Sequence, residues 1–195
     1  QEFQAVGGIG NLDYVLGLYY FTETASDKAQ TPNTNKWNAD GTAYTIVDPS
    51  TYLLATVARA SRAHARSYAA YTNLTYNMDT LHLTVGGRYT RDEKNGTLYT
   101  VNGAASNFTF DQTNNRFDPL VTLAWDAADD INVYAKYASG YRAGGASSRS
   151  VTFASFGAES VKSYELGVKT DLLDRRVRLN VAAYMMDRSN SQFDF

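Results

Sequence analysis

Few residues of this sequence have the types and spacing that catalysis or metal binding requires. There are two histidines, His64 and His82, and no cysteine, so no set of ligands has the spacing of a zinc site. The carboxylate pairs Asp92-Glu93 and Asp129-Asp130 fall at an expected strand end and in an expected turn, where neither makes an acid and base pair. We therefore expect no enzymatic activity, no metal centre and no cofactor, and we interpret His82 as a polar wall residue.

A glycine-rich stretch, Gly7-Gly8-Ile9-Gly10, superficially resembles a phosphate-binding loop. Such loops bind anions because a helix follows and points its free amide groups at them. No helical pattern follows these glycines. The stretch is therefore predicted to be a hairpin turn between two strands.

Three arginines form the main basic cluster of the chain: Arg59, Arg62 and Arg66. Their spacings of three and four predict a short helix that carries them along one side. Arginine binds phosphate and carboxylate oxygens through two parallel hydrogen bonds, which makes this cluster a candidate anion contact. A solvated charged face, or the extension of a strand, is the other interpretation.

Overall composition excludes two classes of protein. The chain has 195 residues, 44% of them hydrophobic, and a net charge of −2, so a general attraction to nucleic acid is not expected. No apolar run approaches the roughly 20 residues that a membrane-spanning helix needs. A helical membrane protein is therefore excluded.

Strict alternation of apolar and polar residues is the strongest signal in the sequence. Leu81, Leu83 and Val85 interleave with His82 and Thr84, which is the period of a strand with one apolar face. The same pattern predicts strands at residues 2–6, 12–23, 66–78, 81–94, 116–126, 131–142, 162–172 and 177–190. Several of them reach the roughly 9 to 11 residues that a tilted strand needs to cross a bilayer. The predicted fold is all-β, an antiparallel meander of about eight long strands that forms part of a large transmembrane β-barrel.

The expected connections alternate in length. Short turns are predicted at 7–11, 79–80, 126–130 and 173–176, and long loops at 24–65, 95–115 and 143–161. Short turns on one side of the sheet and long loops on the other are typical of a membrane β-barrel.

One hairpin gives the predicted pairing in detail. If Leu172 pairs with Val177, then Asp171 faces Arg178 on the polar side of the sheet, and the apolar partners share the other side. In a large barrel the apolar side meets lipid and the polar side lines the interior. Aromatic residues on the apolar side, near strand ends, fit an interfacial girdle: Tyr14, Tyr20, Tyr68, Tyr76, Tyr89, Trp125, Tyr137 and Tyr164.

Three segments resemble TonB-dependent receptors. They are INVYAKYASGYRAGG at 131–145, ESVKSYELGVKTDLLDRRVRLNVAAY at 159–184, and DYVLGLYYFTE at 13–23. The resemblance implies that residues 1–195 are one part of a barrel of about 22 strands in the bacterial outer membrane, filled by a plug domain that this chain does not include. It also implies active transport of a scarce ligand, such as a ferric siderophore, with TonB as the source of energy.

The resemblance also suggests roles for particular residues. Tyr141 and Arg142, near the outer rim, are expected to contact the ligand or the plug. The polar-side residues are expected either to hold the plug or to pair between neighbouring strands; they are Arg88, Lys136, Glu165, Lys169, Asp171 and Arg178. For Arg59, Arg62 and Arg66, the expected anions are lipopolysaccharide phosphates of the outer-membrane lipid, or an anionic ferric chelate.

Two other kinds of protein fit the same alternation of apolar and polar residues. One is a complete eight-stranded membrane barrel with a structural or adhesion role, since eight strands can close around their own side chains. Residues 187–191 break the alternation that a final barrel strand should show, so we expect a truncation instead. The other is a soluble β-barrel that binds an apolar ligand, in which Arg88, Lys169 and Arg178 would face the outside.

Overall fold

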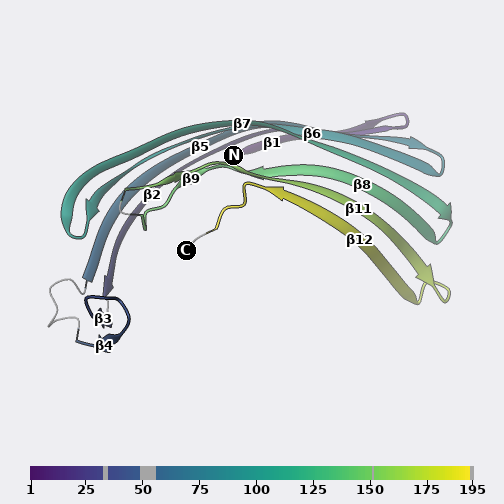
Figure 1. Cartoon of the computed structure of the whole chain (residues 1–195). Helices are drawn as coiled ribbons and strands as arrows, with labels where there is room; N and C mark the ends of the chain where they lie inside the picture. Colours follow the sequence, from purple (N-terminus) through teal and green to yellow (C-terminus); the bar gives the residue numbers. More distant parts are fainter. Residues whose placement is uncertain (33–34, 49–55, 151, 194–195) are drawn as a thin grey trace.

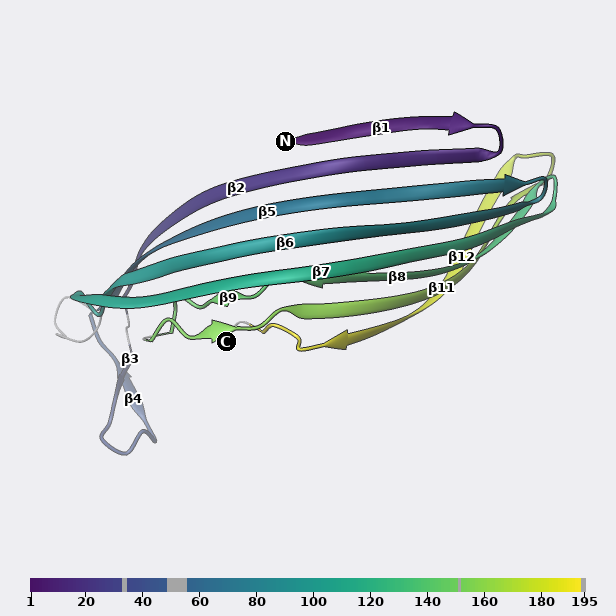
Figure 2. The same ribbon diagram turned by 90° about the horizontal axis from the view of Figure 1, so that it is seen from above.

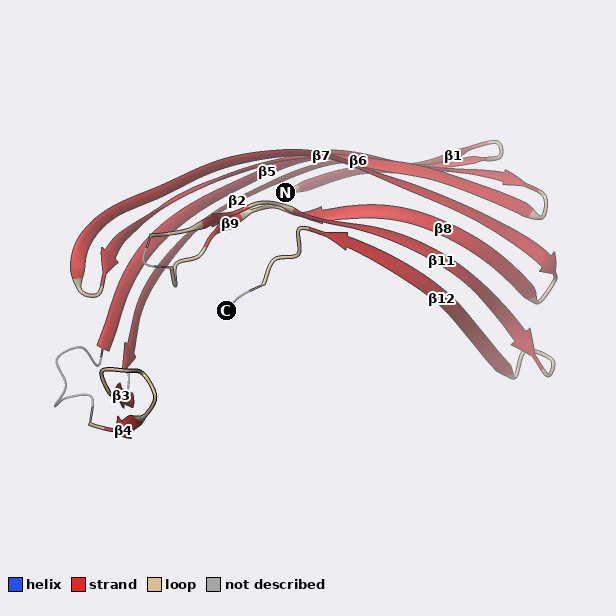
Figure 3. Ribbon diagram, viewed as in Figure 1, coloured by secondary structure: helices blue, strands red, loops and turns tan. Residues whose placement is uncertain are grey.

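The computed structural model describes residues 1–32, 35–48, 56–150 and 152–193. Every regular element within these ranges is a β-strand, and Figure 3 shows no helix. It follows that the described residues contain no helix that is long and apolar enough to cross a membrane.

Eight strands form one antiparallel sheet. In spatial order they are β1 (Glu2–Ile9), β2 (Leu12–Pro32), β5 (Thr56–Met78), β6 (Leu81–Val101), β7 (Ala104–Ala128), β8 (Ile131–Arg142), β11 (Glu159–Leu172) and β12 (Val177–Ser189). Two short hairpins stand apart from this sheet: β3 (Asn35–Trp37) with β4 (Tyr44–Ile46), and β9 (Gly145–Ala146) with β10 (Ser155–Phe156). Each main strand pairs with its neighbours along the chain, which confirms the predicted meander.

The pairing predicted for the last hairpin is confirmed. Leu172 lies opposite Val177, and Asp171 lies opposite Arg178. Because side chains alternate along a strand, this register places the polar side chains of β11 and β12 on one face and the apolar ones on the other.

Four strands are longer, by seven residues or more, than the alternation predicted. β2, β5, β6 and β7 have between 21 and 25 residues each, so the long loop expected at 95–115 is wrong. Those residues continue β6 and β7 into a hairpin that turns at Asn102 and Gly103, both with positive φ as a tight hairpin turn requires. Both faces of this extension carry polar residues, so no alternation marked it as strand.

The main sheet is a curved, open shell (Figures 1 and 2). β1 and β12 are its two edges and do not pair with each other. Four tight turns lie together at one end, which we call the turn end, and the β3–β4 hairpin and the β8–β11 connection lie at the other, the loop end (Figure 1).

The concave side of the shell is the polar side. The β8–β11 connection lies under the concave side (Figure 1), where Phe153 packs edge-on against Phe110 of β7 with ring centroids 5.2 Å apart. Phe110 and Asp118 are an even number of residues apart on β7, and therefore point to the same face. We call this concave face the inner face, and the convex apolar face the outer face.

The outer face carries a continuous apolar band. On β5 it runs from Met78 to Tyr68 in steps of two residues, which is about 33 Å along the strand, or roughly 25 Å of height at a barrel tilt near 40°. Tyrosine pairs mark its border toward the loop end: the rings of Tyr20 and Tyr68 are 5.2 Å apart, and those of Tyr137 and Tyr164 are 5.1 Å apart. The height and the aromatic border match the lipid-facing belt of a membrane barrel.

Almost none of this apolar surface is buried within the chain. Among the described residues only Ala60, Ala69, Leu98 and Phe153 are buried and apolar, while Val181 on the outer face remains 58% exposed. A soluble sheet needs a core on its apolar face. This sheet instead leaves that face open, on its convex side.

Candidate functional site

The inner face gathers most of the residues singled out in the sequence. Register and alternation place Arg88 of β6, Lys136 of β8, and Glu165 and Lys169 of β11 on it, together with Arg178 of β12. They do not form one cluster. They divide among a central hollow, a second hollow nearer the loop end, and a hydrogen-bonded belt at the turn end.

The central hollow surrounds Arg88 and has a volume of about 540 Å³. The Arg88 guanidinium lies over the rings of Tyr19 and Tyr71, 5.0 and 5.6 Å from their centroids, and its Nε donates to Thr90 Oγ1 at 3.0 Å. Cation–π contacts of this kind orient a guanidinium without neutralising it. Its two terminal nitrogens make no hydrogen bond within the described residues, so they are free to bind an anion.

Tyr141 closes the opposite side of the central hollow. By alternation it should point outward, but β8 is no longer paired with β7 beyond Ala138, and its end turns toward the inner face. The Tyr141 hydroxyl therefore donates to Asp92 of β6, and Ser139 Oγ donates to Asp118 of β7 at 2.9 Å. Asp118 is also paired with Arg116 at 3.1 Å, so Asp92 is the carboxylate on this side without an ion pair among the described residues.

Arg142 lies in a different hollow, nearer the loop end, with a volume of about 440 Å³. The sequence grouped it with Tyr141, whereas the structure separates the two. The charged residues around this second hollow are Glu23 and Asp27 of β2, Lys94 of β6, and Arg142. Three phenylalanines, Phe110, Phe153 and Phe156, supply an apolar surface beside them.

Sequence reasoning missed the second hollow, apart from Arg142. Lys94 and Phe110 were assigned to a strand end and to a loop, and Phe153 to another loop. One signal could have found it. If β6 and β7 are extended, Lys94 lies opposite Gln112 and Gly96 opposite Phe110, so these four residues share one face.

Gln192 holds the β8–β11 connection against the inner face. Its side-chain Nε2 lies 3.2 Å from the carbonyl oxygen of Ala143 and 2.9 Å from that of Gly157. Its backbone amide donates to Glu159 Oε2 at 2.9 Å. From the other side, Gln112 Nε2 of β7 donates to the carbonyl of Phe156 at 3.1 Å. The rim of the second hollow is thus bound to β7 and to the segment after β12.

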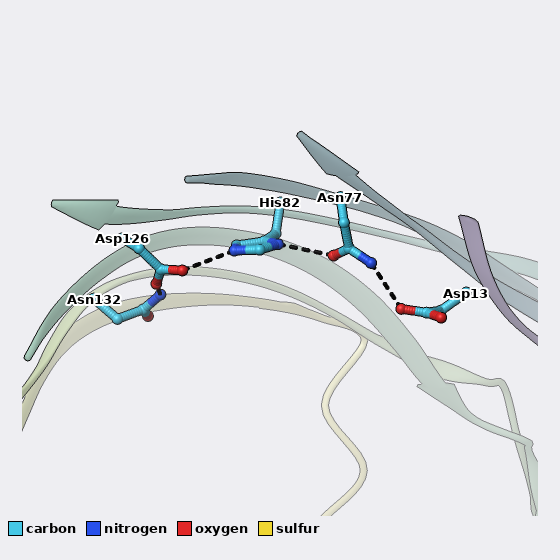
Figure 4. A network of polar contacts seen from close by, with 5 residues as sticks. All are labelled: Asp13, Asn77, His82, Asp126 and Asn132. Carbon is cyan, nitrogen blue, oxygen red and sulfur yellow. Dashed lines mark hydrogen bonds and ion pairs between the residues drawn. The ribbon is translucent and has the colours of Figure 1, made fainter. Parts of the chain in front are cut away.

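A belt of hydrogen bonds crosses five strands at the turn end (Figure 4). Asn77 Nδ2 donates to Asp13 at 2.8 Å, and Asn77 Oδ1 lies 2.8 Å from His82 Nδ1. His82 Nε2 lies 2.9 Å from Asp126, which also accepts from Asn132 Nδ2 at 2.7 Å. Both ring nitrogens of His82 are therefore engaged by side chains of the neighbouring strands. The structure thus places His82 in the wall, as the sequence suggested.

The belt continues at β11 and β12. Arg178 donates two parallel hydrogen bonds to Asp171, at 2.7 and 2.9 Å. Of the two roles expected for the polar-side residues, this pair therefore shows the pairing between neighbouring strands. In the turns outside the sheet, the hydrogen bond from Arg175 to Asp130 raises the pKa of the guanidinium above its ordinary value. The turn end is thereby cross-linked by contacts within the wall.

Lys136, Glu165 and Lys169 lie between the hollows and the belt, and two of them contact Tyr134. Tyr134 donates to Glu165 at 2.5 Å, and the Lys169 ammonium lies 5.3 Å from the centroid of the Tyr134 ring. Lys136 lies opposite Glu165 in the register. These contacts fix Glu165 and Lys169 against the wall.

Of the interpretations left open for Arg59, Arg62 and Arg66, the strand extension is confirmed and the helix is wrong. All three belong to β5, because this segment pairs along its whole length with β2 and β6. Alternation then puts Arg62 and Arg66 on the outer face and Arg59 on the inner one. The spacing of three and four residues fits one side of a helix, but on a strand it divides the cluster between two faces.

The arrangement offers binding surfaces on the inner face. The described residues contain no group of three or more His, Asp or Glu side chains placed to hold a metal ion. Both hollows open to solvent on the inner face and combine cations, carboxylates and aromatic rings, which suits a ligand with aromatic and polar groups, or a polypeptide lying against the wall.

Comparisons with known proteins place this fold among bacterial receptors. Residues 2–195 match the family model described as TonB dependent receptor-like, beta-barrel. Three solved structures are similar. The ferric yersiniabactin uptake receptor FyuA from Yersinia pestis has a TM-score of 0.78 at 20% identity, over 98% of this chain and 28% of that one. The siderophore receptor PiuA from Acinetobacter baumannii has a TM-score of 0.67 at 15% identity, over 93% of this chain and 30% of that one.

The third is the closed form of the ferric-catecholate import receptor Fiu from E. coli K12, with a TM-score of 0.68 at 17% identity, over 97% of this chain and 30% of that one. The chain thus spans less than a third of the length of each of these proteins. At these identities the likeness shows a shared fold.

Proposed function

The chain belongs to the TonB-dependent receptor family, and from this premise we propose that it supplies part of the barrel wall of an outer-membrane transporter for a ferric siderophore. The loop end would face the outside of the cell and the turn end the periplasm, as in membrane barrels with short periplasmic turns. Transport would need a plug domain and TonB, acting through segments that lie outside these 195 residues.

The second hollow is the observation that carries this proposal. It lies on the inner face at the loop end, where an external ligand would arrive first. Its cations, Lys94 and Arg142, stand beside Phe110, Phe153 and Phe156, while Glu23 and Asp27 lie on the β2 strand of the same hollow. Ferric chelates commonly present aromatic rings and anionic oxygens, which the rings and cations can contact. Cations and aromatic faces together favour such a ligand. The similarity to solved siderophore receptors supports the same class of cargo.

The central hollow suits the plug better than the ligand. Arg88 is held on two tyrosine rings with its terminal nitrogens free, and it lies deeper in the wall, farther from the loop end. A carboxylate or a backbone carbonyl of a plug segment would satisfy these donors. We propose Arg88 and Tyr141 as plug contacts, and Arg142 as the ligand contact.

The other two proteins considered fit less well. A closed eight-stranded barrel would pair β1 with β12, but these strands are the open edges of the sheet. A soluble barrel would enclose its apolar face, whereas here that face is convex and exposed. The observed polarity supports a section of wall from a large membrane barrel.

The test uses the complete receptor that carries this chain, because the open sheet needs its neighbours. Binding of ferric catecholate, ferric hydroxamate and ferric phenolate complexes is measured by tryptophan fluorescence, and uptake by radioactive iron in an iron-starved host. At least one complex should bind and enter the cells in a TonB-dependent manner. Failure of all three classes to bind a folded receptor would contradict the siderophore proposal.

A further inference from the structure

Two carboxylates on the wall of the second hollow are left without a partner. Glu23 and Asp27 lie on the inner face of β2, and both residues are exposed. Neither side chain makes an ion pair or a hydrogen bond within the described residues. The same is true of the side chains of Lys94 and Arg142, the two cations of this hollow. Four charges, two of each sign, thus surround one hollow without neutralising one another.

The strand register keeps the two signs apart. Glu23 lies opposite Ala65 of β5, and Ala65 lies opposite Lys94 of β6. The acidic and the basic strand are therefore two strand spacings apart, about 10 Å. Between them, the side chains of β5 that line the hollow on its inner face are small: Ser61, Ala63 and Ala65. A molecule lying across β5 could therefore contact carboxylates on one side and a cation on the other.

The carboxylates closest to the two cations are already engaged. Glu159 lies opposite Arg142 in the register, but its Oε1 is 3.7 Å from Arg188 Nη1. Asp92, two positions along β6 from the lysine, accepts the hydroxyl proton of Tyr141. The cations of the hollow thus stay available to the oxygens of a ligand, and the free carboxylates are those on β2.

The net charge of a ferric complex depends on its chelating groups. Three catecholates around Fe³⁺ give a triply negative complex, whereas three hydroxamates give a neutral one. A hydroxamate chelator that also carries a free amine gives a positive complex. Charges of like sign repel one another over distances of about 10 Å when little water lies between them. Free carboxylates on β2 would therefore oppose the catecholate complex and favour the amine.

We propose that Glu23 and Asp27 determine the charge specificity of the second hollow. They bind a cationic amine carried by a ferric complex of low net charge, while Lys94 and Arg142 contact the metal-bound oxygens of the same complex. A strongly anionic ferric complex is disfavoured. This inference rests on the function proposed above and adds to it the class of ferric complex that the receptor prefers.

The test compares two double variants of the complete receptor in mild detergent at low ionic strength. Glu23→Gln/Asp27→Asn removes two negative charges from the inner face. The control, Glu93→Gln/Asp111→Asn, removes two negative charges from the outer face of β6 and β7 near the same end of the sheet. Heat-modifiable gel mobility shows that each variant is folded.

Three ferric complexes are titrated by tryptophan fluorescence. The first is a linear trihydroxamate with a free terminal amine, the second is the same chelator with its amine acetylated, and the third is a tricatecholate. The parent should bind the amine complex about tenfold more tightly than the acetylated one, as expected for one charge-assisted hydrogen bond.

The inner-face variant should lose the preference for the amine. It should also bind the ferric tricatecholate about tenfold more tightly than the parent does, because the repulsion by two carboxylates is removed. The outer-face control should behave like the parent. Such a gain in affinity cannot come from a damaged fold.

Two results would overturn the proposal. One is a parent that binds the acetylated complex as tightly as the amine complex, and the other is an inner-face variant with no gain in affinity for the tricatecholate. A folded parent that binds none of these complexes, and no ferric phenolate either, would contradict the proposed function itself, and this inference would fall with it. If the double variant does not fold, Glu23→Gln and Asp27→Asn should each show the same two changes at smaller size.

Discussion

The outer and inner faces of the sheet are built by the same strands, yet their side chains are satisfied in different ways. On the outer face, large apolar residues such as Val181 and Leu166 stay about 60% exposed, and no described part of the chain covers them. On the inner face at the turn end, polar side chains bind to those of neighbouring strands, as Arg178 does to Asp171. Toward the loop end, the inner face leaves cations such as Arg88 and Arg142 in open hollows.

This difference shows what each surface needs to be complete. The outer face needs an apolar environment along its whole length, which lipid supplies. The turn end of the inner face is complete in itself, so its charges are part of the wall. The loop end is incomplete, and a bound molecule would satisfy its free donors. Three predictions separate these cases, and the largest effect is expected on the outer face.

A charge in the apolar band should destabilise the barrel most. Val168 lies near mid-band on the outer face of β11, between Val133 and Val181. Val168→Arg should lower the free energy of unfolding by about 2 to 4 kcal/mol, the usual cost of arginine on the lipid face at the bilayer midplane. Urea unfolding of the complete protein in lipid vesicles measures the change.

The matched control is Ala182→Arg, which adds the same charge to the inner face of β12, opposite Gly167. Its effect should be below about 1 kcal/mol because the inner face is polar and wet. Equal losses in both variants would contradict the assignment of the two faces.

Removal of a belt residue should come next. His82→Ala loses contacts to both Asn77 and Asp126 and so disconnects β5 from β7 on the inner face. We expect a loss of roughly 1 to 2 kcal/mol, in line with two hydrogen bonds of ordinary net strength. His64→Ala loses the single contact to Thr24 and should cost less. If the two alanine variants unfold at the same urea concentration, the belt does not stabilise the wall as described.

The smallest expected effect distinguishes the two ends of the inner face. Arg142→Ala should weaken binding of the preferred ferric complex by about tenfold, as expected for one charge-assisted hydrogen bond. Arg178→Ala should leave that affinity unchanged, since Arg178 is engaged with Asp171 at the far end. Fluorescence titration of both folded variants measures the dissociation constants. A weaker affinity for the Arg178 variant alone would reverse the roles assigned to the two ends.

The sequence predicted the parts of the fold that lipid constrains. Where one face meets lipid, every second residue must be apolar, and the register at Leu172 and Val177 followed from that rule. Outside the lipid the rule no longer applies. The extensions of β6 and β7 carry polar residues on both faces, and were therefore interpreted as a loop.

The binding surfaces were predicted less completely, because they depend on departures from regular pairing. Tyr141 reaches the inner face only because β8 leaves β7 beyond Ala138, and no local pattern indicates this. The second hollow needs Phe153 to meet Phe110, a contact between two segments that were both interpreted as loops. Arg62 and Arg66 were found by their spacing, which left a helix and a strand extension open, and only the pairing with β2 and β6 shows that the strand is correct.

The assignment of faces is the central claim, and a scan of single cysteines along β11 tests it most directly. These 195 residues contain no cysteine. Nitroxide labels are placed one at a time from 164 to 171 in the complete protein, with any cysteine outside these residues replaced by serine, and the protein is reconstituted in lipid vesicles. Labels at the even positions, Tyr164 to Thr170, should be accessible to dissolved oxygen and protected from a water-soluble nickel complex. Labels at the odd positions, Glu165 to Asp171, should show lower oxygen accessibility. A uniform profile, or one with the two sets exchanged, would contradict the account.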